Sequence, residues 1–93
     1  MITHVVLFKL KEASPVNIEK SKGVLLNMRG KIPQLRDIVV GIDLLRSARS
    51  YDLALITQFA SMEDLQIYQD HPVHQEVLAY MATVRESSIC VDF

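Results

Sequence analysis

Three histidines and one tyrosine are the side chains in this sequence that are best suited to moving protons. His71 and His74 lie on either side of Pro72, and Tyr68 stands just before His71. Because an unperturbed imidazole titrates at about pH 6.5, His74 can act as a general base near neutral pH. Tyr68 can donate a hydrogen bond to a carbonyl oxygen that gains negative charge during proton abstraction. With His4 orienting either group or the ligand, these residues predict an acid–base catalytic site.

A structural interpretation of the same residues stays open beside the catalytic one. Under it, His4 is satisfied inside the core and His71 caps the helical segment that follows it. Tyr68 then contributes only packing, and His74 lies on the edge of an apolar helix face. The residue types alone fit both interpretations.

A metal site is a third possibility. His4, His71 and His74 would supply three nitrogen ligands, the number of protein ligands in an open zinc site. However, Pro72 directs His71 away from regular helical geometry, and the sequence fixes no carboxylate behind these ligands. We therefore expect no metal and no organic cofactor.

Two other groups of polar or reactive residues have simpler explanations. Cys90 alternates with Ile89 and Val91, so we expect it to be a buried small hydrophobe rather than a reactive thiol. Arg46 and Arg49 belong to a short polar segment, and we expect them to form a solvated basic loop.

Composition places the chain among small cytoplasmic proteins that associate with themselves. Its 93 residues suffice for one domain, residues 1–93, and 49% of them are hydrophobic, which favours a self-association surface. The net charge of −1 comes from intermixed acids and bases, so nucleic-acid binding is not expected. The single cysteine fits a reducing compartment. The apolar run at residues 5–10 is too short to span a membrane and lacks the cleavage site of a signal peptide.

Hydrophobic periodicity predicts the secondary structure. Strands are expected at residues 2–10, 35–45, 51–60 and 88–93. Ser14 and Pro15 predict the start of a helix that runs to about residue 31. Ser61 opens a capping-box pattern and predicts a second helix, which must stop or bend at Pro72. A further helical segment follows to about residue 84.

The order β-α-β-β-α-β predicts an α+β protein with a ferredoxin-like fold, in which an antiparallel sheet carries its helices on one face. Strand periodicity leaves the opposite face of the sheet apolar as well. We therefore expect a homodimer in which two such open faces meet and close a barrel, giving a dimeric α+β barrel.

The same periodicity gives the candidate site a place in this fold. His4 shares its strand face with Val6 and Phe8, so it is expected to be enclosed. If the broken helix packs over that face, His4, Tyr68 and His74 converge on a small pocket. The residues expected to line or shape this pocket are Phe8, Leu25, His71, Pro72 and Val77.

The sequence resembles the stress-responsive A/B barrel domain family, also called the Dabb family, within the dimeric α+β barrel superfamily. The resemblance covers nearly the whole chain, and its most specific stretch is residues 71–74, His-Pro-Val-His. Its other parts are residues 4–11, Ile32-Pro33, Val40-Gly41, residues 51–55, Phe59, Tyr68 and residues 91–93.

The resemblance implies homodimers whose sheets close a barrel. It also implies a kind of chemistry. One plant branch of the family comprises polyketide cyclases, which close a linear polyketide by aldol chemistry with histidines and a tyrosine at positions that match His4, Tyr68 and His74.

Two hypotheses about function follow. In the first, the homodimer binds or transforms a small organic molecule by cyclase-, lyase- or isomerase-like acid–base chemistry. In the second, the chain is a non-catalytic, stress-related binding or structural dimer, and the same residues only pack.

Overall fold

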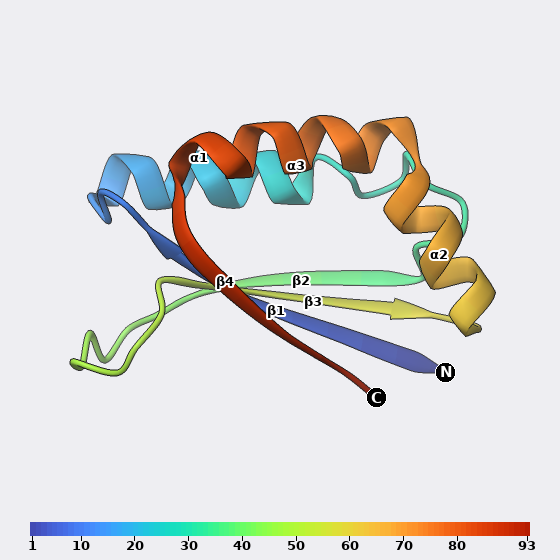
Figure 1. Cartoon of the computed structure of the whole chain (residues 1–93), viewed down its shortest axis with the longest axis horizontal. Coiled ribbons are helices and arrows are strands. Elements are labelled where there is room, and N and C mark those ends of the chain that lie inside the picture. Colours follow the sequence, from blue (N-terminus) through green and yellow to red (C-terminus); the bar gives the residue numbers. More distant parts are fainter.

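Four antiparallel strands form one sheet in the computed structural model, which describes residues 1–93. The strands are β1 (Ile2–Leu10), β2 (Asp37–Ile42), β3 (Leu53–Phe59) and β4 (Arg85–Asp92). They lie in the order β2-β3-β1-β4, so β1 lies inside the sheet between β3 and β4 (Figure 1). The predicted ferredoxin-like α+β fold is confirmed.

Three helices cover one face of this sheet (Figure 1). They are α1 (Pro15–Leu26), α2 (Met62–Asp70) and α3 (Pro72–Val84). The Ser14 hydroxyl accepts a hydrogen bond from the Asn17 amide at 3.2 Å and caps α1. None of the three helices has the length and apolar character that crossing a bilayer requires.

The predicted break at Pro72 separates α2 from α3. His71 between them has an extended backbone (φ −65°, ψ 138°), as expected for a residue before proline. Its Nδ1 atom accepts a hydrogen bond from the Val73 amide at 3.1 Å, so His71 caps α3, and Pro72 occupies the first helical position.

The boundaries of four elements differ from the sequence prediction. Helix α1 ends at Leu26, five residues early, because the following residues form turns that lead to Gly30 in a left-handed conformation (φ 78°). Strands β2 and β3 are shorter than expected at both ends. Strand β4 begins three residues early at Arg85, where α3 stops and pairing with β1 begins.

The core lies between the helices and the covered face of the sheet. Its fully buried side chains include Leu53 and Phe59 from the sheet and Leu25 and Met81 from the helices. This is the face that carries His4 and Phe8, as strand periodicity predicted.

The opposite face of the sheet is apolar and uncovered. Pairing across the four strands aligns Val39, Ile56, Val5 and Val91 in one row. Large hydrophobic side chains on this face are about half exposed or more: Val39 49%, Ile89 51%, Val91 63% and Phe93 71%. We call this surface, with the neighbouring Leu7, the open face.

Cys90 is exposed, so the expectation of a buried small hydrophobe is wrong. It stands opposite Val6 and points to the helix side of the sheet. However, β4 is the edge strand, and almost all of its residues are exposed. Alternation predicts the face on which a side chain lies, but whether that face is covered depends on the position of the strand in the sheet.

Arg46 is more constrained than a solvated loop residue. Its guanidinium donates a hydrogen bond at 2.8 Å to Oδ1 of Asp52, which is buried, and its backbone has a positive φ of 56°. The second carboxylate oxygen of Asp52 accepts a hydrogen bond from the Leu10 amide at 2.7 Å. Asp52 therefore ties the loop between β2 and β3 to the end of β1.

Replacing this buried carboxylate should destabilise the fold. Asp52→Ala leaves the Leu10 amide without an acceptor, and we expect the free energy of unfolding to fall by about 1–3 kcal/mol in urea denaturation. Asp43→Ala is the control, because Asp43 contacts the same arginine from the exposed loop. An equal loss in both variants would contradict the role assigned to Asp52.

Candidate functional site

A cavity of about 380 Å³ lies between the covered face of the sheet and the three helices. Its size falls in the lower part of the range for small-molecule sites. His4, Tyr68 and His74 all line it, so the structure brings together the three residues that the sequence singled out. Of the expected lining residues, Phe8, Leu25 and Val77 line it as well. His71 and Pro72 do not line it, and their role is to break the helix above it.

Tyr68 projects from α2 and is fully buried. Its ring lies 4.8 Å from that of Phe59 and 4.4 Å from that of His74, between centroids. The hydroxyl has no hydrogen-bond partner within the protein. Burial raises the pKa of this hydroxyl well above its usual value, because the charged form would be desolvated. Tyr68 is therefore a neutral donor without an acceptor.

His74 lies in the first turn of α3, and its tautomer follows from its hydrogen bond. Its Nδ1 atom is 3.0 Å from the carbonyl oxygen of Gln69. Because a carbonyl only accepts, Nδ1 carries the proton and Nε2 keeps its lone pair. Burial lowers the pKa of His74, the hydrogen bond to Gln69 opposes this shift, and the nearby His4 adds to it. His74 is thus a neutral imidazole with a free basic nitrogen.

His4 on β1 is buried and paired with a carboxylate that the sequence analysis missed. Its Nδ1 atom donates to Oδ1 of Asp92, which lies directly across the β1–β4 ladder. Such a carboxylate fixes the ring and its tautomer, leaving Nε2 of His4 free. Alternation along β4 places Asp92 on the helix side. The sequence contains no signal for the strand register that sets it opposite His4.

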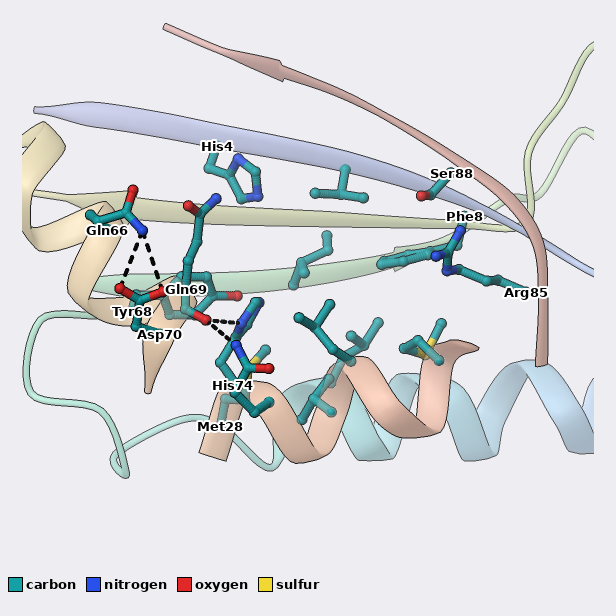
Figure 2. A pocket seen from close by; sticks show the side chains of 17 residues that line it. His4, Phe8, Met28, Gln66, Tyr68, Gln69, Asp70, His74, Arg85 and Ser88 are labelled. Carbon is teal, nitrogen blue, oxygen red and sulfur yellow. Dashed lines mark hydrogen bonds between the residues drawn. The ribbon is translucent and has the colours of Figure 1, made fainter. Parts of the chain in front are cut away.

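Two further groups of pocket residues were also missed. Gln66, Gln69, Asp70 and Gln75 surround the His74 end, where Gln66 donates to Asp70 and the side chain of Gln75 shares the Gln69 carbonyl with His74. Arg85 and Ser88 stand at the other end, near Phe8 (Figure 2). The spacing of residues 66 and 70 on one helix face is a signal for the first group.

The three histidines do not converge on a metal site. The Nδ1 atom of His71 is occupied by the Val73 amide, and His71 does not line the pocket. No group of three histidine, cysteine, aspartate or glutamate side chains is close enough to hold a metal ion.

The fold agrees with a match to a known family. The family model described as the stress-responsive A/B barrel domain, Dabb, matches residues 2–93. The chain belongs to this family. The match spans the complete ferredoxin-like fold and includes every residue of the candidate site.

Solved structures support the same assignment for the Dabb chain. A protein of unknown function from Bacteroides fragilis, described as dimeric with a ferredoxin-like fold, is 30% identical with a TM-score of 0.83. The match covers 99% of this chain and 93% of that one. A dimeric ferredoxin-like protein of unknown function from Thermobifida fusca is 30% identical with a TM-score of 0.87, covering 99% and 88%.

A more distant similarity shows the fold alone. A hydroxynitrile lyase from Passiflora edulis is 18% identical with a TM-score of 0.85, covering 99% of this chain and 90% of the lyase. No curated protein sequence matches the chain.

The electrostatic environment of His74 should be visible in its titration. We expect its NMR titration midpoint to lie below the value of about 6.5 for an unperturbed imidazole, because burial disfavours the charged ring. Between the two pKa values the unfolded chain binds more protons than the folded one. The contribution of neutral His74 to the free energy of unfolding is therefore complete above about pH 6.5. It is lost as the pH falls toward the pKa of His74 in the folded protein.

His74→Gln removes this titration and serves as the control. Wild-type protein should lose stability relative to His74→Gln as the pH falls below about 6.5. A midpoint at or above the unperturbed value would contradict the description of His74 as a buried neutral base.

Proposed function

We propose that this Dabb protein binds a small carbonyl compound in the pocket and abstracts a proton from the carbon next to the carbonyl. The observation that carries the proposal is the Tyr68 hydroxyl, which is buried without a partner while its ring contacts that of His74. A buried donor without an acceptor costs stability, and a ligand carbonyl oxygen would supply the missing acceptor.

The proposed step uses two side chains and no cofactor. Nε2 of His74 takes the proton, and the electron pair of the broken C–H bond forms a carbon–carbon double bond. The carbonyl π pair moves onto oxygen, which accepts a hydrogen bond from the neutral Tyr68 hydroxyl. His4, held by Asp92, orients the ligand from β1. The resulting enolate is the nucleophile of aldol cyclisation and the intermediate of isomerisation, which matches the chemistry implied by the resemblance to the plant cyclases.

The environment supports this assignment of roles. Burial keeps Tyr68 protonated and His74 unprotonated near neutral pH, which are the states that a donor and a base require. One protein of the same fold is a hydroxynitrile lyase, so the fold is compatible with lyase chemistry.

The open face supports a homodimer as the functional unit. Its apolar row crosses all four strands, and leaving it in water would be costly. Similar proteins from Bacteroides fragilis and Thermobifida fusca are described as dimeric. We propose that two open faces pack together and close a barrel, with the pockets on the outer, helix-covered sides.

The alternative function is a non-catalytic, stress-related binding or structural role for the same dimer. The apolar open face is equally consistent with it, because dimerisation explains the exposed hydrophobic residues whether or not the pocket is catalytic. For either function the cytoplasm is the setting that we propose, since the single Cys90 suits a reducing compartment.

Deuterium exchange separates the two functions. In D₂O, wild-type protein should accelerate exchange of the α-protons of 2-octanone, followed by proton NMR, and His74→Gln should abolish the acceleration. Tyr68→Phe should reduce it by about 10²–10³, the usual cost of removing one donor to a developing oxyanion. Tyr51→Phe, outside the pocket, is the matched control. Binding without exchange would favour the non-catalytic alternative, and exchange that survives in folded His74→Gln would overturn the assignment of the base.

The dimer can be tested at the centre of the open face. Val5 pairs with both Ile56 and Val91, so Val5→Lys would place a charge in the proposed interface. Wild-type protein should sediment as a dimer at micromolar concentration, and Val5→Lys should sediment as a monomer. Val16→Lys on α1 is the control, because Val16 is already 76% exposed. A monomeric wild-type protein would contradict the proposed interface.

A further inference from the structure

The pocket is elongated, and its two ends differ in chemistry. His4, Tyr68 and His74 lie at one end, while Phe8, Ser88 and Arg85 lie at the other (Figure 2). Four residues along β1 separate His4 from Phe8, which corresponds to about 13 Å. Eleven residues separate His74 from Arg85, which corresponds to about 16 Å along the helix axis. A ligand that fills the pocket must therefore reach well beyond the acid–base site.

Arg85 has no partner within the protein. Two of the other four arginines are bound: Arg29 donates to the carbonyl oxygen of Ile38 at 2.9 Å, and Arg46 pairs with Asp52. Arg36 and Arg49 also lack a side-chain partner, but neither of them lines this pocket. Arg85 is exposed and its guanidinium makes no hydrogen bond or ion pair, while its side chain lines the pocket. Figure 2 shows this side chain reaching from the end of α3 toward Phe8. A positive charge just after α3 would also interact favourably with the helix dipole. That interaction alone would not require the side chain to line the pocket.

The other pocket charges make the two ends electrostatically opposite. Asp70 lines the end that holds His74, and Asp92 is paired with His4 at that same end. Arg85 carries the only permanent positive charge in the pocket lining. An anionic group would be repelled from the carboxylates and attracted to the guanidinium, so these charges would orient an asymmetric ligand.

The surface between the two ends is apolar. Val6 and Leu55 line it from the sheet, and Leu25, Val77 and Met81 line it from the helices. These side chains suit a hydrocarbon segment, because burying apolar surface is favourable and they present no hydrogen-bonding group. The pocket thus places a hydrocarbon-binding stretch between a proton-transfer end and a cationic end.

We infer that the substrate is a linear oxo-carboxylic acid, whose carboxylate binds Arg85 while its carbonyl oxygen meets Tyr68. This inference rests on the proposed function for the carbonyl end only. The planar guanidinium matches a carboxylate in a two-point contact, and the Ser88 hydroxyl can donate to the same group. One guanidinium balances one negative charge, so a carboxylate fits this end better than a dianionic phosphate.

Binding measurements on four matched probes test the inference. The probes are 7-oxooctanoate, its methyl ester, octanoate and 6-oxoheptyl phosphate, titrated by calorimetry and by the NMR signals of the His74 ring. We expect 7-oxooctanoate to bind about tenfold more tightly than its methyl ester, the effect of one partly exposed charged hydrogen-bonded pair. Tighter binding of the phosphate would overturn the assignment to a carboxylate.

Arginine variants locate the contact. Arg85→Gln should weaken 7-oxooctanoate binding about tenfold and leave the methyl ester unchanged, whereas Arg85→Lys should retain part of the preference. Arg36→Gln is the matched control, since it removes the same charge from an exposed residue outside the pocket. Equal affinities for acid and ester, or equal effects of the two glutamine variants, would overturn the inference.

The probes also separate this inference from the proposed function. In one outcome, octanoate and 7-oxooctanoate both bind through Arg85, but neither 7-oxooctanoate nor its methyl ester shifts the His74 signals. Carboxylate recognition then stands and the proposed carbonyl site fails. If the ester shifts His74 and exchanges its α-protons as well as the acid does, the carbonyl site stands and the role of Arg85 fails.

Discussion

Pro72 has no amide hydrogen and forces His71 out of helical geometry, and the arrangement of the pocket depends on this constraint. A continuous helix over residues 62–84 would be a straight rod about 34 Å long. Tyr68 and His74, six residues apart, would then point about 120° away from each other around its axis. The break turns α2 against α3, so that their rings meet at 4.4 Å and Gln69 can accept from His74. The conformational restriction that Pro72 places on His71 therefore creates the contact between Tyr68 and His74 on which the proposed chemistry depends.

Asp52 and Tyr68 are two buried polar side chains that differ in their hydrogen bonding. Asp52 is buried with both carboxylate oxygens hydrogen-bonded, and it joins a loop to a central strand. Tyr68 is buried with its hydroxyl unpaired. An unsatisfied buried group of this kind costs about 1–3 kcal/mol, so the free protein holds the pocket at some expense of stability. Stability is given up at the place where a ligand would restore it, as expected for a preorganised binding site.

Periodicity and capping patterns were sufficient to predict the order of elements, the helix break and the face of the sheet that carries His4. They also placed His4, Tyr68 and His74 around one pocket, on the condition that the broken helix packs over the strand face that carries His4. Asp92 could not be predicted, since its partnership with His4 depends on a register between segments 88 residues apart. Arg85 was missed because the last strand was expected to start three residues later. The register between strands and the exact strand starts are set by tertiary packing, which local patterns do not contain.

Strand β4 has two different faces, and this has a consequence for how the chain can vary. From Ser88 onward its even-numbered residues, such as Asp92, belong to the side of the helices, and its odd-numbered residues, such as Val91, belong to the open face. Inserting or deleting a single residue before this strand would exchange the two sets. The Asp92 carboxylate would then lie on the apolar open face, and a valine would take its place beside His4. Length changes at this junction should therefore be tolerated only in pairs.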